Sequence, residues 1–126
     1  SSLVKDYTHQ ITGEIEIEGY LCHQIELIPL PSAPVVWGKV ILWISKEKSF
    51  TLKSEFYDED EKLVNVQTAS KIKNFGDREL PSYMEIIPVN KEGHKTILTI
   101  EKAAYNVKGI DEKMFSQQMM KRIRPE

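Results

Sequence analysis

The chain has 126 residues, one cysteine and a nearly balanced charge, with 17 Lys and Arg against 19 Asp and Glu. This length fits one domain with its own core. The charge balance argues against a nucleic-acid surface, which needs a basic face. No apolar run approaches the roughly 20 residues of a membrane-spanning helix, and the single Cys22 excludes an internal disulfide.

Short segments that alternate apolar and polar residues follow one another along the chain, separated by turn residues. Turn chemistry is clearest at Asp58 to Lys62 and at Asn74 to Asp77. This spacing predicts an antiparallel meander of about six to eight strands. The expected strands occupy residues 7–18, 20–28, 35–47, 50–57, 63–74, 82–87 and 94–101.

The expected strand over residues 35–47 is apolar on both faces. A strand with one wet face should alternate apolar and polar residues, and this one scarcely does. Its sheet is therefore expected to meet something apolar on each side: a covering helix, a partner chain or a lipid-like ligand. One face carries Val36, Val40, Leu42 and Ile44, and the other carries Trp37, Ile41 and Trp43.

In the C-terminal segment, the spacing of the apolar residues changes from the alternation of a strand to that of a helix. Phe115, Met119 and Ile123 recur every four residues, which predicts an amphipathic helix across 111–122 with Arg124 in its last turn. We expect the apolar stripe of this helix to pack onto the sheet. Docking of the same stripe in the groove of a partner is the alternative.

The sequence carries no catalytic or metal-binding pattern. Cys22 and His23 are neighbours on an expected strand, so their side chains point to opposite faces and cannot form a nucleophile–base pair. His9, His23 and His94 lack metal-ligand spacing. We therefore predict a protein that is not an enzyme and that uses no metal or cofactor.

An ordered set of segments resembles the bacterial outer-membrane lipoprotein-sorting (LolA-like) family and covers nearly the whole chain. The chain departs from the family pattern at Thr51, where Pro is common, and at Glu61, where Gly is usual; both changes affect turn geometry. The segments that carry the resemblance are Val35–Glu47, Phe50–Lys53, Glu55–Asp60, Leu80–Glu85, Gly93–Thr96, Tyr105–Val107 and Phe115–Ser116.

The resemblance implies a mainly β, α+β fold: a curved antiparallel sheet that forms an incomplete half-barrel with a C-terminal helix and an apolar cavity. It implies one LolA-like domain over residues 1–126, which we expect to lack the N-terminal part of the family domain. It also implies a periplasmic carrier or binder of lipid or lipoprotein acyl chains, with a transient membrane-associated partner. A protein-interaction or stress-sensing regulatory module on the same scaffold is the alternative.

Ten apolar residues make up the candidate acyl-chain site, and an ordinary core is the alternative interpretation of the same face. They are Val36, Val40, Leu42, Ile44, Leu52, Phe56, Met84, Ile86, Leu98 and Ile100. Trp37, Ile41 and Trp43 are the candidate interface residues. Because unpaired sheet edges favour self-pairing, we also expect a homodimer with Trp37 or Trp43 buried at the contact.

Overall fold

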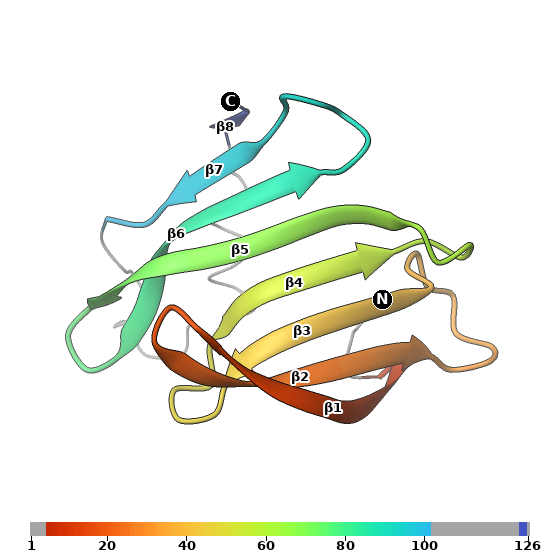
Figure 1. Ribbon diagram of the computed structural model, residues 1–126, viewed down its shortest axis with the longest axis horizontal. Helices are drawn as coiled ribbons and strands as arrows, with labels where there is room; N and C mark the ends of the chain where they lie inside the picture. The colour runs from red at the N-terminus through yellow and green to blue at the C-terminus, as the bar shows by residue number, and fades with distance from the viewer. Residues whose placement is uncertain (1–4, 102–123, 126) are drawn as a thin grey trace.

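The computed structural model describes residues 5–101 and 124–125, which form one curved, unclosed antiparallel sheet (Figure 1). The order of the strands in the sheet is their order in the chain, so the predicted meander is confirmed. The strands are β1 (Tyr7–Ile17), β2 (Tyr20–Pro29), β3 (Lys39–Ser45), β4 (Thr51–Tyr57), β5 (Leu63–Asn74), β6 (Glu79–Pro88), β7 (Thr96–Thr99) and β8 (Arg124–Pro125).

Two tight turns set the register of their hairpins. Glu18 and Gly19 join β1 to β2 with positive φ angles of 53° and 81°, the backbone that a two-residue turn needs to match the strand twist. In the β4–β5 turn, the Asp58 side chain accepts hydrogen bonds from the backbone N–H groups of Asp60 and Lys62, at 2.8 and 3.0 Å. Glu61, where the resembling family has Gly, adopts a φ of 62° in this turn.

The strand expected over residues 35–47 is shorter in the structure, because β3 begins only at Lys39. At Gly38 the backbone passes so close to the β4–β5 turn that an added Cβ would lie 2.5 Å from the Asp58 carbonyl oxygen. The alternation of the strand therefore cannot be extended back through Gly38. Val36 lies at a bend with 73% of its surface exposed, so its predicted place on the strand is wrong.

The remaining expected strands agree with the structure to within a few residues, although β6 is longer and β7 is shorter than predicted. The expected helix across 111–122 lies outside the described residues. Arg124, predicted for the last turn of that helix, pairs with Ile97 as part of β8 instead. In the part of the chain that the structure describes, no helix is long and apolar enough to cross a membrane.

Cross-strand pairing sorts the side chains onto two faces, since directly opposed residues point to the same side of a sheet. The Leu42 face carries Ile25, Leu27, Val40, Leu42, Ile44, Leu52, Ser54, Phe56, Asn65, Gln67, Ala69, Met84, Ile86 and Leu98. The Trp43 face carries Gln24, Ile41, Trp43, Lys53, Glu55, Tyr57, Val66, Thr68, Tyr83, Glu85 and Ile97.

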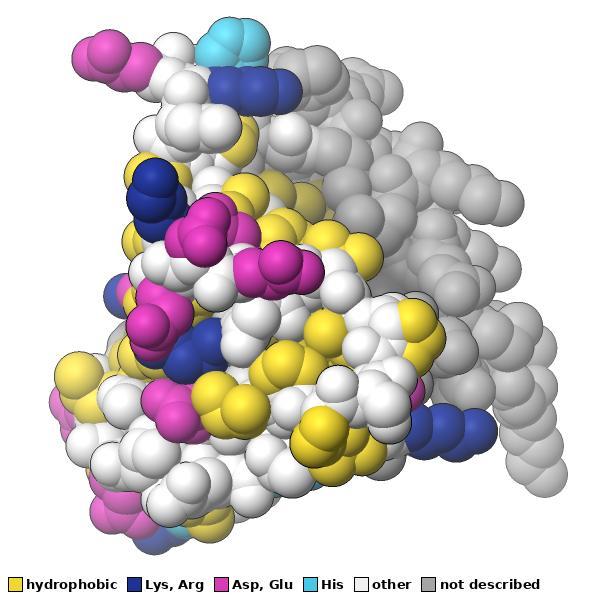
Figure 2. Space-filling model, turned by 90° about the vertical axis from the view of Figure 1, so that its right-hand side faces the viewer, with side chains coloured by type: hydrophobic (Ala, Val, Ile, Leu, Met, Phe, Trp, Pro, Cys, Tyr) yellow, Lys and Arg dark blue, Asp and Glu magenta, His cyan; other side chains and the backbone are white. Residues whose placement is uncertain are grey.

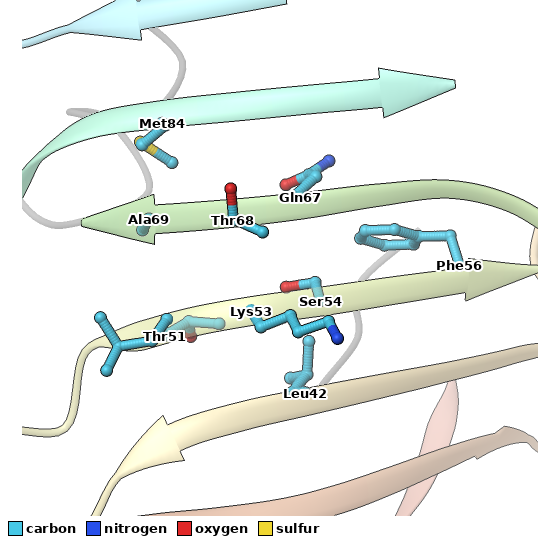
Figure 3. Close-up of a pocket in the computed structure, with 10 residues that line it drawn as sticks. Leu42, Thr51, Lys53, Ser54, Phe56, Gln67, Thr68, Ala69 and Met84 are labelled. Carbon is cyan, nitrogen blue, oxygen red and sulfur yellow. The ribbon is translucent and has the colours of Figure 1, made fainter. Parts of the chain in front are cut away.

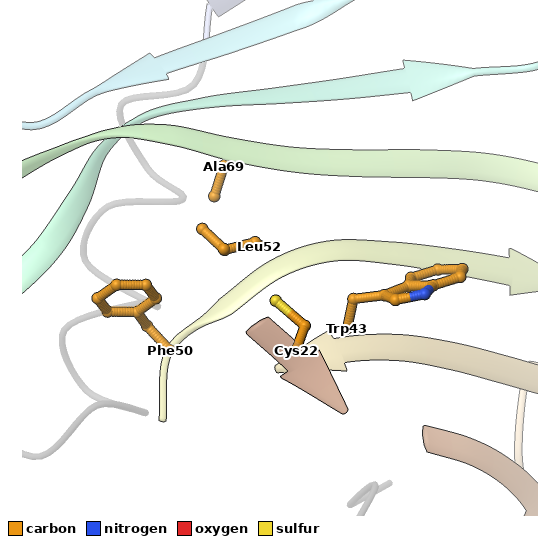
Figure 4. Close-up of a cluster of buried hydrophobic side chains, with 5 residues drawn as sticks. All are labelled: Cys22, Trp43, Phe50, Leu52 and Ala69. Carbon is orange, nitrogen blue, oxygen red and sulfur yellow. The ribbon is translucent and has the colours of Figure 1, made fainter. Parts of the chain in front are cut away.

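Two clusters of buried side chains hold the sheet together. One joins Cys22, Trp43, Phe50, Leu52 and Ala69 from strands β2 to β5 and the turn before β4 (Figure 4). The other joins Tyr7, Leu27 and Val40, on which Trp37 and Phe56 pack. These clusters draw on β1 to β5, and most of their side chains come from β2 to β4 and the turn before β4.

Candidate ligand-binding pocket

The register of the central strands forms two neighbouring rows of side chains on the Leu42 face, one partly polar and the other apolar. One row runs Leu42, Ser54, Gln67, Ile86 across β3 to β6. The adjacent row toward the β3–β4 turn is apolar and contains Leu52, Ala69, Met84 and Leu98. The face is therefore mostly hydrocarbon, with polar side chains in its middle.

A pocket of about 360 Å³ opens over these two rows (Figure 3). This volume lies within the range of small-molecule sites, which are typically apolar with a few placed polar groups. The residues that line the pocket are Leu42, Thr51, Leu52, Lys53, Ser54, Phe56, Gln67, Thr68, Ala69 and Met84.

The neutral polar residues Ser54 and Gln67 both line the pocket. Ser54 is only 6% exposed, and neither its hydroxyl nor the Gln67 amide makes a hydrogen bond within residues 5–101. Asn65 lies two residues before Gln67 on the same face, and its Oδ1 atom is buried and accepts no hydrogen bond there. Ser54 and Gln67 therefore keep unused hydrogen-bonding capacity at the pocket, whereas Asn65 is not among the residues that line it.

Charge is held away from the pocket. Lys53 borders it, but the Lys53 ammonium lies 5.0 Å from the centre of the Trp43 ring and 3.7 Å from a Glu55 carboxylate oxygen. An acyl chain offers nothing to a fixed charge, so this arrangement suits a largely apolar ligand.

The described residues offer little for catalysis. Cys22 is fully buried, and that burial raises the pKa of its thiol, which keeps it protonated and weakly nucleophilic. Within residues 5–101, no group of three His, Cys, Asp or Glu side chains could hold a metal ion.

The structure brings most of the predicted cavity residues to one face. Val40, Leu42, Ile44, Leu52, Phe56, Met84, Ile86 and Leu98 share the Leu42 face, and Ile100 follows β7 with its N–H bonded to the Ser82 carbonyl oxygen. Leu42, Leu52, Phe56 and Met84 line the pocket itself. Val36 is separate from them, in the exposed bend before β3.

Sequence reasoning missed the polar residues of the pocket. Ser54 and Gln67 lie between apolar residues in strands, and a polar residue there is usually assigned to the solvent. The alternation of Leu52, Ser54 and Phe56 carried a usable signal, because it places the serine on the apolar face.

The three candidate interface residues do not share one surface. Trp43 is only 8% exposed, and its indole N–H donates to the Gln24 side chain at 3.1 Å. Trp37 lies before β3 and packs against Phe56 of the Leu42 face, with ring centres 5.2 Å apart. Placing Trp37 on the same face as Trp43 was therefore wrong, because the strand alternation stops at Gly38. A contact role for Trp37, Ile41 and Trp43 stays a prediction.

The apolar side chains that remain exposed are scattered. In Figure 2 they form separate yellow groups between charged and polar atoms. The large ones are Ile11, Ile15, Leu21, Ile28, Leu30, Val36 and Val89. Single exposed apolar residues of this kind are ordinary on protein surfaces.

A family model with the description "Uncharacterized protein" matches residues 1–122. The chain belongs to this family. A comparison with curated proteins finds no match.

Solved structures share the fold of this family member at low sequence identity. A LolA superfamily protein from Nitrosomonas europaea matches with a TM-score of 0.63 and 19% identity, over 90% of this chain and 50% of its own. A putative outer membrane lipoprotein-sorting protein domain from Vibrio parahaemolyticus gives 0.58 and 18%, over 94% and 50%. A DUF1329 family protein from Desulfovibrio piger gives 0.60 and 20%, over 68% and 35%.

These matches confirm the predicted LolA-like fold. The chain spans half or less of the length of each of these structures. At such identities the likeness concerns the arrangement of the strands.

Proposed function

We propose that the protein is a non-enzymatic periplasmic binder or carrier of acyl chains from lipids or lipoproteins. The observation that carries the proposal is the pocket of about 360 Å³ on the Leu42 face, with Leu42, Leu52, Phe56 and Met84 in its lining. The LolA-like fold supports it, because one neighbour of that fold is described as an outer membrane lipoprotein-sorting domain.

The energetics favour an acyl chain as the ligand. Each methylene group that leaves water for such a pocket contributes about 0.8 kcal/mol. The gain does not depend on the direction of the chain, since dispersion and desolvation are not directional. A pocket of this kind accepts acyl chains of varied length and releases them by simple withdrawal, as a carrier requires.

Two adjacent residues of β3 provide a matched test, because they point to opposite faces. Leu42 lines the pocket, whereas Ile41 belongs to the Trp43 face. Binding of a fluorescent fatty acid should fall at least about tenfold in Leu42→Asn, because the new amide must be desolvated by the ligand. Ile41→Asn should bind like the parent protein, and Ile86→Asn, also on the Leu42 face, should be weakened.

Thermal unfolding of the same variants separates a pocket from an ordinary core. If the site is an open pocket, water can enter it in the absence of ligand and hydrogen-bond to the new amide of Leu42→Asn. The thermal unfolding midpoint of this variant should then fall only modestly. A large loss of midpoint, together with no fatty-acid binding by the parent chain, contradicts the proposal. Mass spectrometry of the native purified protein adds an independent readout, since it detects co-purified lipid.

We also propose that the protein forms a homodimer through the edge of β1. Within residues 5–101, β1 pairs on one side only, with β2, and Ile11 and Ile15 of this strand are 59% and 50% exposed. A long exposed edge with apolar side chains is a template for a second strand. Sedimentation should show a dimer that Ile11→Lys dissociates, and a monomer at high micromolar concentration contradicts this assignment.

A further inference from the structure

The space in the pocket and the residue that closes one end of it indicate how much of an acyl chain the protein holds. Resting on the proposed function, we infer that the pocket takes one acyl chain, covers about 14 of its carbon atoms, and is limited in length by the Phe56 ring. Phe56 is thus a specificity-determining residue for the ligand of the Leu42 face.

The volume of the pocket suits a single chain. An apolar cavity of about 150 Å³ holds one molecule of benzene, a ring of six carbon atoms. On that scale, the volume of about 360 Å³ on the Leu42 face has room for about 14 carbon atoms. Two or three chains of that length, side by side, would need two or three times this space. The pocket therefore fits one chain at a time.

The pocket ends at Phe56. Val40 and Asn65 are directly opposed to Phe56 across β3 and β5, yet neither of them lines the pocket. The lining on these two strands begins only two residues further along, with Leu42 and Gln67. In Figure 3, Phe56 lies at one end of the lining residues, and its ring points toward them. A chain that lies along the face is therefore stopped by this ring.

Neighbouring side chains hold the Phe56 ring in place. The Trp37 ring packs against it, with ring centres 5.2 Å apart and an angle of 50° between the ring planes. Both rings pack on the buried cluster of Tyr7, Leu27 and Val40. The Tyr7 hydroxyl also donates to the Trp37 carbonyl oxygen at 3.1 Å. Because a close-packed ring can move aside only by losing these contacts, Phe56 is a firm limit.

The rest of the lining sets no such limit on length. Leu52 and Ala69 are 1% and 6% exposed, so their packing leaves no further depth below the chain. Met84 lies at the end opposite Phe56 (Figure 3) and is half-buried. Its unbranched side chain adapts to what it contacts. The fixed limit on chain length therefore lies at the Phe56 end.

A series of saturated fatty acids from about 8 to about 20 carbon atoms measures this limit, by displacement of a fluorescent fatty acid. Affinity should rise about fourfold with each methylene group up to about 14 carbon atoms and then level off, because further methylene groups stay in water. One fatty acid should bind per protein chain. Affinity that keeps rising through the longest acid, or two acids bound per chain, overturns the inference.

Two adjacent aromatic residues of β4 give matched variants. Phe56→Ala removes a ring from the end of the pocket, so the plateau should move up by about four carbon atoms, since the site collapses in part. Phe56→Leu, which keeps more of the packing, should move it by about two. Tyr57→Ala, on the Trp43 face, should leave the plateau unchanged. A plateau that stays in place in both Phe56 variants, or that Tyr57→Ala also moves, overturns the role of Phe56.

These outcomes differ from a failure of the proposed function. If no fatty acid of the series binds, acyl binding itself is overturned. If the acids bind without a plateau, acyl binding stands and the single-chain limit is overturned. N-tetradecanoyl-triglycine amide identifies the source of the chain: tighter binding than tetradecanoic acid indicates an acylated polypeptide, and equal or weaker binding indicates a lipid.

Discussion

The two faces of the sheet differ in composition: the Leu42 face is mostly apolar, whereas apolar, aromatic and charged side chains are mixed on the Trp43 face. On the Leu42 face, apolar side chains meet one another around a pocket, and the polar side chains in their midst have unused hydrogen bonds. On the Trp43 face, lysines lie over aromatic rings: Lys39 over Tyr57 at 4.5 Å, Lys53 over Trp43 at 5.0 Å.

This comparison indicates that a strand face with many apolar residues can be stable without a helix, partner chain or ligand packed over it. The lysine stems shield the aromatic rings while their ammonium groups stay in water. The Tyr57 and Tyr83 hydroxyl groups donate to Glu55 and Glu85 at 2.7 and 2.8 Å. Several polar groups of the Trp43 face therefore have partners on the same face, whereas Ser54 and Gln67 on the Leu42 face make no hydrogen bond to another described residue.

The largest expected difference between the faces concerns core packing. Leu52 on the Leu42 face is 1% exposed, and Leu52→Ala should lower the free energy of unfolding by about 3 kcal/mol through lost burial and a residual cavity. Ile41→Ala, at a half-buried position of the Trp43 face, should cost about 1 kcal/mol. Urea denaturation measures both values, and equal losses would show that the faces do not differ in packing.

The point at which the alternation of β3 between the two faces begins depends on Gly38. A Cβ atom at this position would lie 2.5 Å from the Asp58 carbonyl oxygen, so Gly38→Ala must displace backbone. We expect a loss of about 2 kcal/mol in the free energy of unfolding, typical of overpacking. Gly19→Ala is not a matched control because Gly19 has a positive φ; Gly13→Ala, where the nearest contact is 4.0 Å away, is one and should cost less than half as much.

A smaller effect tests whether the Trp43 face satisfies its own polar groups. Gln24→Leu removes the acceptor of the Trp43 indole N–H, which is bonded at 3.1 Å in the parent protein. Leaving this donor unpaired should cost about 1 kcal/mol and shift the tryptophan emission. Gln24 also donates to the Thr12 hydroxyl, so Thr12→Val serves as the control. A loss in Thr12→Val as large as in Gln24→Leu would assign the effect to that second bond.

The smallest expected effect is a pH dependence on the Trp43 face. Burial, and then the hydrogen bond to Glu55, raise the pKa of Tyr57 to about 12, from 10.0 in its unperturbed state. The folded protein thus favours the protonated phenol, and this contribution to stability is complete below pH 10 and is lost as the pH rises toward 12. Between pH 10 and pH 12, the thermal midpoint of Tyr57→Phe should therefore fall less than that of the parent protein. The difference between the two midpoints at pH 8 serves as the reference. An unchanged slope would mean that Tyr57 ionises equally easily in both states.

The sequence was sufficient for most of the sheet because local alternation determines which residues share a face. Residues 63–74 form β5 as predicted, and the cavity residues from Val40 to Leu98 lie on one face. The prediction failed at Val36 and Trp37 because Gly38 approaches Asp58, which is twenty residues away and leaves no periodic signal. It missed Gln67 because only pairing across β5 and β6 shows that this amide faces hydrocarbon.

The sequential order of the strands has a consequence for how the chain reaches its native state. Each strand from β1 to β6 pairs with the strand that follows it closely in the chain, so none of these pairings must wait for a distant segment. Hairpin contacts are close in sequence, and a low contact order speeds folding by keeping the entropy of loop closure small. Folding can thus begin at any tight hairpin and extend strand by strand. The Gly19 and Asp58 turns are the natural starting points, ahead of the longer connection between β2 and β3.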